Sequence, residues 1–245
     1  MVMKLTLFFI GLTFSLMNTP ELTAQPDRYD VTRLTKSMTL DANWDKPEWS
    51  GVKEIQVART MGNVPEFVPT VRAKMMYDDQ HVYIIFKVKD RFVRSKATEI
   101  NGRIWEDSCV EFFFAPDVSN AMAYFNLEIN CGGVPLFHFK DPAKPGAPLP
   151  SVGDIQKIEI AHSMPKVVEP EVKKETTFTV EYRIPVSMLE RYASVQKPTK
   201  GVRWNGNFYK CADQTSNPHW LTWSKVENPT PNFHLPQFFG HLYFQ

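Results

Sequence analysis

This chain has no clear excess of positive or of negative charge. Its 28 Lys and Arg residues are balanced by 27 Asp and Glu residues, so the formal net charge is +1 over 245 residues. Binding to nucleic acid or to an anionic membrane is normally driven by a clear excess of positive charge. The composition therefore argues against a nucleic-acid partner and favours a neutral one.

Cysteine is also scarce, with three residues at positions 109, 131 and 211. Three thiols can form at most one disulfide and leave one cysteine over. Two of the three fall in predicted strands, where buried free thiols are an equally good interpretation. The sequence has no C-x-x-C spacing and its six His residues are scattered, so no zinc site is predicted.

One long apolar run is present, at the N-terminus. Lys4 precedes apolar residues 5–17, which are followed by polar residues, a proline and Ala24. These are the three regions of a secretory signal peptide, and the run is too short to be a permanent membrane anchor. We therefore predict a signal peptide over residues 1–24, a single mature domain over residues 25–245, and a secreted or periplasmic location.

The most informative strand lies in the stretch RIWEDSCVEFFFAP, residues 103–116. Phe112 and Phe114 alternate there with Glu111, and this period of two predicts a β-strand with one face in the core. A carboxylate on the other face would cost several kcal/mol to bury unpaired, so that face should meet water, a cation or a polar ligand. Trp105 stands just upstream beside two acidic residues, an arrangement typical of sugar sites. The simpler interpretation is that the ring caps the core and Glu111 pairs with a basic side chain.

The rest of the chain repeats the same alternation. A Pro-rich loop at residues 141–150 interrupts the strands, a charged hinge is expected at 166–175, and PVSMLERYA at 185–193 is the single predicted helix. Strands are predicted at 38–49 (running into a turn), 70–76, 81–88, 103–116, 123–129, 135–140, 155–161, 177–184, 202–211, 219–224 and 239–244. With no internal repeat and no βαβ alternation, the pattern predicts an all-β fold, an antiparallel β-sandwich of jelly-roll type with one short helix.

Six sequence blocks then occur in a definite order. They are LDANWDKPEW, MMYDDQHVYIIFKVKD, WEDSCVEFFF, FNLEINCGG, WNGNFYKC and NFHLPQFFGHLYF. Together they span residues 39–244, nearly the whole mature chain. In this order and spacing the sequence resembles a family 9 carbohydrate-binding module, of the DOMON-like sandwich superfamily. The resemblance implies a non-catalytic domain that binds sugar.

The resemblance also implies a set of site residues. In that family two aromatic rings sandwich a terminal sugar, while side chains of the concave sheet bind its hydroxyl groups. Trp105 is implied as one ring and Phe233 as the other, although Phe233 is smaller than the Trp of the family. Glu111, Asn126 and Asn207 fall where the polar sugar ligands stand, and Asn126 replaces an expected basic residue.

These residue types also suit sugar recognition on chemical grounds. A pyranose carries C–H groups on its faces and hydroxyl groups around its edge, so aromatic rings cover the faces while amides and carboxylates meet the edge. His219 and His234 are expected at the rim of such a site. For either Asn taken alone, a structural role in a turn or at a sheet edge is more common than a role in binding.

Partners and cofactors follow from the same resemblance. Because the chain shows no catalytic domain of its own, we expect it to bind an oligosaccharide or polysaccharide in support of separate glycoside hydrolases. No cofactor is predicted. Structural calcium, seen in the resembled family, is compatible with Asp and backbone oxygens, although no EF-hand-like loop marks a site.

Two other functions stay open. DOMON-like sandwiches include haem carriers with Met and His axial ligands, and Met75, Met76 and His81 are residues of those types. Glu106 together with Glu111 offers the paired carboxyl groups of a glycoside hydrolase. No G-x-S-x-G nucleophile motif accompanies them.

Overall fold

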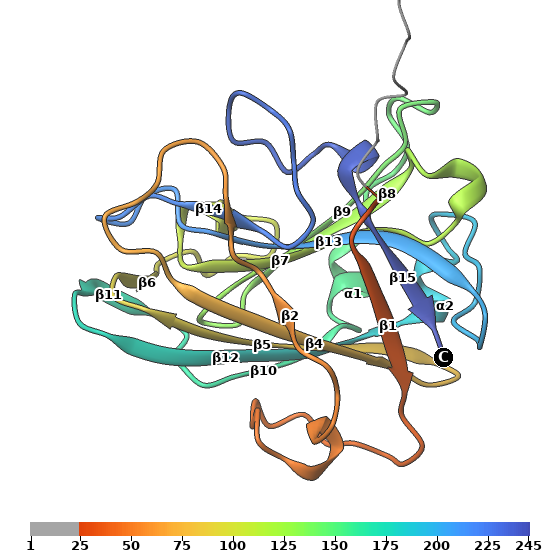
Figure 1. The fold of residues 1–245 in the computed structure, drawn as a ribbon, viewed down its shortest axis with the longest axis horizontal. Helices are drawn as coiled ribbons and strands as arrows, with labels where there is room; N and C mark the ends of the chain where they lie inside the picture. Colours follow the sequence, from red (N-terminus) through yellow and green to blue (C-terminus); the bar gives the residue numbers. More distant parts are fainter. Residues whose placement is uncertain (1–24) are drawn as a thin grey trace, which may run out of the picture.

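Two β-sheets pack face to face in the computed structural model, which describes residues 25–245 (Figure 1). The predicted signal peptide lies outside the described residues. The first sheet runs in the spatial order β10 (Glu159–His162), β12 (Thr176–Pro185), β5 (His81–Asp90), β4 (Thr70–Tyr77) and β1 (Arg28–Arg33), with β2 (Ile55–Gln56) beside β4. The second sheet continues from β1 through β15 (Gly240–Phe244), β13 (Arg203–Cys211), β7 (Cys109–Ala115), β8 (Tyr124–Asn130) and β9 (Pro135–Lys140).

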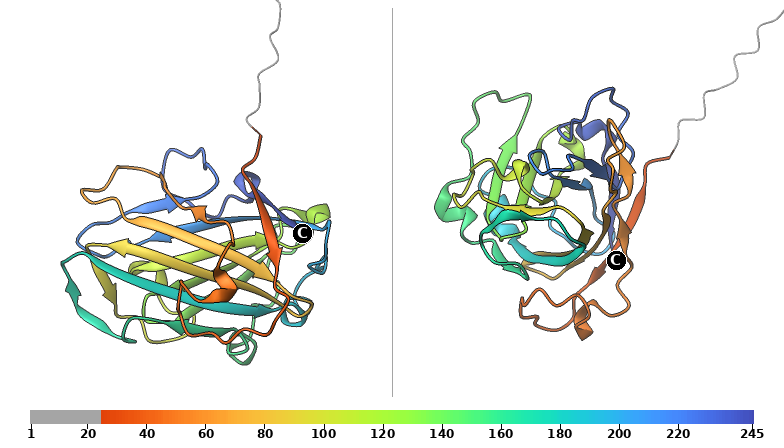
Figure 2. Two further views of the ribbon diagram at one scale, coloured as in Figure 1. Left: turned by 60° about the horizontal axis from the view of Figure 1, so that its bottom comes forward. Right: turned by 90° about the vertical axis from the view of Figure 1, so that its left-hand side faces the viewer.

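Four further strands complete the fold. β14 (Trp220–Thr222) pairs with β13, and β3 (Arg59–Thr60) pairs with β14. β6 (Val93–Ser95) and β11 (Val168–Val172) form a separate two-stranded sheet. The predicted all-β sandwich is therefore confirmed, and the two layers are seen edge-on in Figure 2.

Strand β1 joins the two sheets and was not predicted. Its first four residues pair with β15, and Thr32 and Arg33 pair with the end of β4. Both pairings are parallel, whereas the other strand pairings of residues 25–245 are antiparallel. The sandwich is thus closed along one edge by a strand that belongs to both layers.

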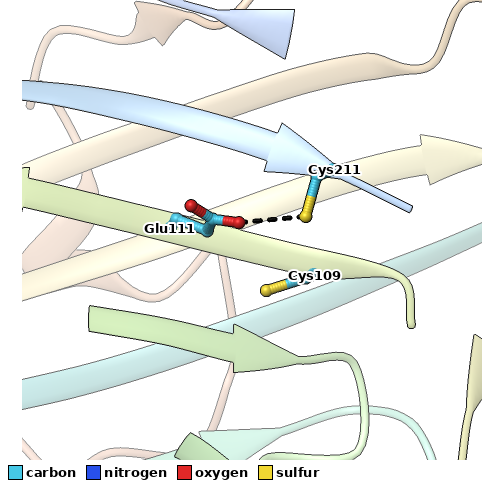
Figure 3. A group of neighbouring side chains, drawn as sticks. All are labelled: Cys109, Glu111 and Cys211. Carbon is cyan, nitrogen blue, oxygen red and sulfur yellow. Dashed lines mark hydrogen bonds between the residues drawn. The ribbon is translucent and has the colours of Figure 1, made fainter. Parts of the chain in front are cut away.

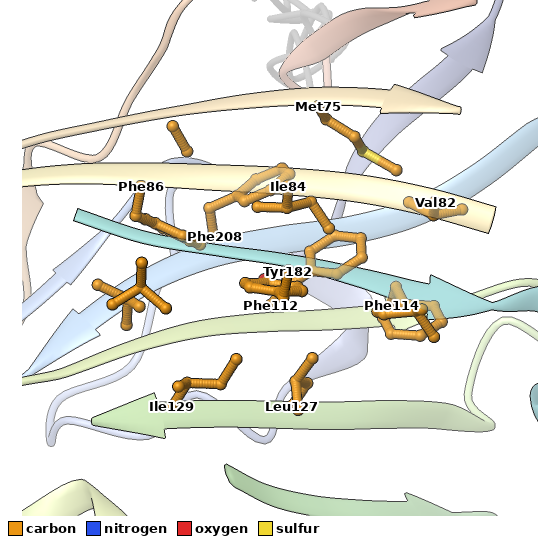
Figure 4. Close-up of a cluster of buried hydrophobic side chains, with 14 of the residues drawn as sticks. Met75, Val82, Ile84, Phe86, Phe112, Phe114, Leu127, Ile129, Tyr182 and Phe208 are labelled. Carbon is orange, nitrogen blue, oxygen red and sulfur yellow. The ribbon is translucent and has the colours of Figure 1, made fainter. Parts of the chain in front are cut away.

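The main core fills the space between the sheets (Figure 4). Phe112 stacks on Phe114 with ring centroids 4.6 Å apart, and on Phe208 at 4.7 Å. Residues of the first sheet such as Ile84 and Tyr182 pack against them from the other side. The predicted core face of β7 is confirmed, because alternation along the strand sends these rings inward and sends Glu111 to the opposite side.

A second layer covers the outside of the first sheet. The Glu181 carboxylate on β12 accepts hydrogen bonds from the Trp49 indole at 2.8 Å and from the backbone N–H groups of Asp41 and Ala42, each at 2.9 Å. Lys46 lies 2.6 Å from the same carboxylate. The segment that was expected to begin as a strand, residues 38–49, is instead a loop held on this buried anion.

Helical structure among the described residues is limited to short segments. They are α1 (Val152–Ile155), α2 (Val186–Leu189) and the 3-10 turns η1 (Pro47–Trp49), η2 (Ile104–Glu106), η3 (Val118–Asn120) and η4 (Pro236–Phe238). The predicted helix is thus four residues long, and hydrogen-bonded turns continue it to Ala193. No helix in residues 25–245 has the length and apolar character needed to cross a membrane.

Two further boundaries differ from the prediction. The stretch expected to be a strand from Ile155 begins as α1, because Ser151 caps that helix by accepting a hydrogen bond from the Asp154 N–H. The expected hinge at residues 166–175 contains β11, which gains order by pairing with β6. The first difference thus has a local cause, the helix cap, whereas the second depends on a strand distant in sequence.

Candidate functional site

A cavity of about 400 Å³ opens on the face of the second sheet that points away from the main core. Its floor is built by neighbouring strands in register. Glu111 on β7 lies opposite Glu128 on β8, and Phe113 lies opposite Asn126. Residues directly opposite each other on paired strands point to the same side, so all four side chains line this cavity. Its walls come from η2 and from the loops that carry residues 213–220 and 231–234.

Three large aromatic side chains line the walls. Trp105 and Trp220 are half-buried, and the Trp220 indole N–H donates to Asp213 Oδ1 at 2.9 Å. Phe233 stacks on Tyr209 with ring centroids 4.1 Å apart and an angle of 13° between the planes. The cavity therefore offers flat apolar surfaces whose positions are fixed by hydrogen bonding and stacking.

The floor carries polar atoms that lack partners. The Asn126 amide donates to Glu128 Oε1 at 3.0 Å. Asn126 Oδ1 and Glu128 Oε2 are both buried, and neither has a hydrogen-bond partner within the described chain. Leaving a buried polar atom unpaired costs about 1–3 kcal/mol, so these two atoms mark the place where a polar ligand or water completes the structure.

A compact group of thiols and a carboxyl lies at one end of the floor (Figure 3). The Cys211 thiol donates to Glu111 Oε1 at 2.9 Å, and Cys109 lies beside them, with the three ligand atoms within 4.8 Å of one another. Cys109 and Cys211 are paired across β7 and β13. Two sulfurs and one oxygen suit a zinc-like ion, in contrast to the oxygen ligands that calcium prefers.

Burial sets the charge of the cavity. It raises the pKa of the Glu111 carboxyl well above the usual range, and the adjacent Cys211 and Glu128 act in the same direction. Burial also raises the pKa of Glu128 to about 7, against the lowering effects of the Asn126 hydrogen bond and of Lys140. The pKa of Asp213 is raised for the same main reason. Carboxyl groups that hold protons near neutral pH can donate as well as accept hydrogen bonds.

A basic rim borders the cavity on the side of β9. His138, Lys140 and His234 line it, and the Lys140 Nζ lies 3.3 Å from His234 Nδ1. Burial, together with Lys140 and His138, lowers the pKa of His234 to about 4, so this ring is neutral at pH 7. His234 thus occupies the expected rim, whereas His219 is fully buried elsewhere, 2.8 Å from the Lys210 Nζ.

Four of the five predicted site residues come together. Trp105, Glu111, Asn126 and Phe233 all line the cavity. Asn207 lies outside its lining and is fully buried. The Asn207 amide donates to Thr222 Oγ1 and to the Ser224 carbonyl, and its oxygen accepts from the N–H groups of Phe208 and Ser224. Every polar atom of that side chain is therefore used within the protein.

Glu128, Trp220 and Asp213 are among the lining residues that the sequence reasoning missed. Glu128 follows Asn126 by two positions, so the period of the strand was a sufficient signal for it. Trp220 and Asp213 come together through their mutual hydrogen bond, which no local pattern encodes. Trp223, the next tryptophan along the chain, instead packs in the main core against Phe208.

The residues considered for haem binding do not converge. Met75 lies in the main core between the sheets, whereas Met76 lies on the outer side of the first sheet with Tyr83. His81 lies at the start of β5, 3.6 Å from Asp78. Glu106, considered for hydrolysis, lies outside the lining of the cavity and pairs with Arg103 at 2.7 Å.

A sandwich with a cavity of rings and polar side chains on one sheet face defines a ligand-binding domain. Residues 40–244 match a family model described as carbohydrate-binding family 9. Because the match spans most of the chain, the protein belongs to this family of carbohydrate-binding domains. The comparison with curated proteins found no match.

Solved structures share the fold. A Bacteroides uniformis protein whose description proposes carbohydrate binding is similar at 28% identity and TM-score 0.81, over 90% of this chain and 100% of that chain. A family 9 carbohydrate-binding module from Caldicellulosiruptor kristjanssonii in complex with cellotriose is similar at 17% identity and TM-score 0.61, over 89% and 93% of the two chains. The same kind of module from that organism in complex with glucose shows 16% identity and TM-score 0.61, over 89% and 96%.

Proposed function

We propose that this protein binds a sugar without transforming it, in the cavity between Trp105, Trp220 and Phe233. The observation that carries the proposal is the pair of buried, unpartnered oxygens on Asn126 and Glu128, two residues that line the same cavity as these rings. Hydroxyl groups at the edge of a pyranose would donate to them, while the C–H faces of the sugar contact the rings.

The ionisation of the floor supports a neutral ligand. Glu111 and Glu128 both have raised pKa values, so ionising them in the same cavity is costly. A sugar hydroxyl can accept from a protonated carboxyl or donate to an ionised one, whereas a ligand carboxylate would be repelled once either Glu ionises. We therefore propose neutral sugars as the ligand class.

The biological setting is part of the proposal. Residues 5–17 have the pattern of a secretory signal, and family 9 domains bind carbohydrate, so we infer that the protein is exported and assists glycoside hydrolases in polysaccharide breakdown. Recovery of a chain that lacks about the first 24 residues from outside the cytoplasm would support this, and an intact chain in the cytoplasm would refute it.

One observation favours a second candidate function, glycoside hydrolysis. Glu111 and Glu128 lie opposite each other in the same cavity, and hydrolases use a pair of carboxyl groups on either side of the glycosidic bond. Release of reducing ends by the wild-type protein, abolished by Glu128→Gln, would support this alternative. Binding without product release supports the non-catalytic proposal.

A glycan array followed by calorimetric titration tests the binding proposal. Trp105→Ala removes one ring and should weaken binding of the selected sugar by about 1–3 kcal/mol, with an unchanged circular dichroism spectrum. Tyr243→Ala serves as the matched control, because Tyr243 is a partly exposed ring outside the cavity lining. Equal affinities of Trp105→Ala and Tyr243→Ala would contradict the proposal.

A further inference from the structure

A second hollow adjoins the cavity, between the Pro-rich loop that follows β9 and the segment around η4. It encloses about 620 Å³. β9 is the edge strand of the second sheet, so the loop extends the molecule beyond that edge (Figure 2). Met122, Phe139, Pro142, Pro145, Leu149 and Pro236 give this groove its apolar lining.

The groove is continuous with the cavity. Lys140 and His234 line both of them, and they lie 3.3 Å apart at Nζ and Nδ1. The Tyr124 hydroxyl, which also lines the groove, lies 3.0 Å from His234 Nδ1. A ligand that leaves the cavity on this side therefore passes over a shared polar ridge directly into the groove.

The loop that forms the outer wall is held in shape by its own hydrogen bonds. Asp141 Oδ1 accepts from the Ala143 N–H at 2.9 Å, and the Asp141 carbonyl accepts from the Lys144 N–H at 2.9 Å. The Ala147 N–H donates to the Lys144 carbonyl at 3.1 Å. Proline adds fixed backbone angles, so a ligand would lose little affinity to ordering this wall.

The groove combines exposed apolar side chains with hydrogen-bond donors. Leu149 and Met122 are 55% and 47% exposed, so a ligand in the groove would remove apolar surface from water. Lys144 and Gln237 stand among them as hydrogen-bond donors. Apolar contacts with a few polar groups between them suit the faces and hydroxyl groups of pyranose rings.

We propose that this groove is a second subsite, which binds the sugar units that follow the one held in the cavity. The ligand is thus an oligosaccharide or polysaccharide chain that crosses the ridge of Lys140 and His234. The inference rests on the proposed function and extends it, because it states that affinity depends on chain length and assigns that dependence to the Pro-rich loop.

Calorimetric titration with glucose and cellotriose tests the subsite, or with the one-unit and three-unit members of whichever glycan the array selects. In the wild-type protein the three-unit sugar should bind roughly 10-fold more tightly than the one-unit sugar, which corresponds to about 1.4 kcal/mol. The double variant Met122→Ser/Leu149→Ser should lose most of this difference and keep the affinity for the single unit. Val167→Ser is the matched control, since Val167 is 50% exposed and lies outside the groove lining.

The outcomes separate the two proposals. If the wild-type protein binds one-unit and three-unit sugars equally, or if the double variant weakens both to the same degree, the second subsite is overturned while sugar binding stands. If the wild-type protein binds no glycan of the array, the proposed function itself fails and the subsite fails with it.

Discussion

Glu111 and Glu128 lie directly opposite each other on β7 and β8, so two carboxyl groups with raised pKa values share the floor of one cavity. Such a pair disfavours the ionised state, because each negative charge is poorly hydrated and repels the other. The same two residues that would bind the ligand therefore make the folded protein sensitive to pH.

The first prediction concerns that sensitivity. The pKa of Glu128 is about 7 in the folded protein against 4.5 when unperturbed. Between pH 4.5 and pH 7 the folded state therefore keeps a proton that the unfolded state releases. The free energy of unfolding should therefore fall as pH rises from 4.5 to 7, by at most about 3 kcal/mol from this group. Glu128→Gln cannot ionise and should lack this loss.

Denaturant unfolding of both proteins at pH 5 and pH 8 measures the effect. The informative quantity is the difference between wild type and variant, because the lowered pKa of His234 makes stability fall toward acid in both proteins. Wild type should lose stability relative to Glu128→Gln on going to pH 8. If the difference in unfolding free energy between wild type and Glu128→Gln is the same at pH 5 and pH 8, the raised pKa of Glu128 is contradicted.

The two neighbouring tryptophans should behave differently. Trp220→Ala removes a half-buried ring from the cavity wall and should weaken sugar binding by about 1–3 kcal/mol with little change in unfolding free energy. Trp223→Ala empties part of the main core and should destabilise the fold by about 3–5 kcal/mol. Calorimetry and denaturant unfolding of both variants check this, and a reversed pattern would show that the two rings have been assigned to the wrong environments.

A similar contrast separates two asparagines. Asn207→Ala leaves the buried N–H of Ser224 without its acceptor and takes a donor from the Thr222 hydroxyl, which still donates to the Ser224 carbonyl. It should cost roughly 2–3 kcal/mol of stability. Asn126→Ala removes a cavity oxygen, so its main effect should be on sugar affinity. It also removes a hydrogen bond that lowers the pKa of Glu128, which should therefore titrate at higher pH. Thermal unfolding of the two variants measures their stability, and calorimetric titration with the selected sugar measures their affinity. Equal losses of stability in both variants would contradict this contrast.

The packing of the loop of residues 38–49 on the first sheet should depend on Glu181. Glu181→Gln removes the buried charge that pairs with Lys46, which then keeps only the exposed Asp41 carboxylate as a charged partner, and should destabilise the protein by about 3 kcal/mol. Glu190→Gln is the matched control, because its pair with Lys197 is exposed and should contribute less than about 0.5 kcal/mol. Denaturant midpoints of the two variants give the comparison, and similar midpoints would argue against an anchoring role for Glu181.

The thiols should react slowly in the native protein. Burial raises the pKa of Cys109 and Cys131 to about 12, and it also raises the pKa of Cys211 well above the usual range of a thiol. Cys211 is the one of these three that lines the cavity, so it should react first with a thiol reagent, and bound sugar should slow it. Cys211→Ser should remove the fastest phase. Rapid labelling of all three thiols at neutral pH would be inconsistent with their buried positions.

Much of the cavity floor could be predicted from alternation alone. The period of two along residues 109–115 places Glu111 opposite the core face, and the same period places Asn126 and Glu128 together on β8. The register between strands could not be predicted, because it depends on turns and on packing far from these residues. Only the structure therefore shows that Glu111 and Glu128 lie opposite each other.

Asn207 shows the other limit of the pattern. It shares the strand face of Cys211, as alternation requires, yet its amide is used entirely by Thr222 and Ser224. A side chain on the correct face can meet a ligand or be covered by another strand. For Asn207 the outcome depends on the path of the chain after β13, which brings Thr222 and Ser224 over it. In the same way β1 was missed, because six residues of ordinary composition gain their structure from two partners distant in sequence.

The position of β1 has a consequence for the order in which the protein can be completed. Arg28 pairs with His241, so the seam between the two layers needs residues from both extremes of the described chain. Pairing over so long a separation in sequence is slow, so this seam should be among the last parts of the described chain to form. Removing β15 would open the same seam as removing β1.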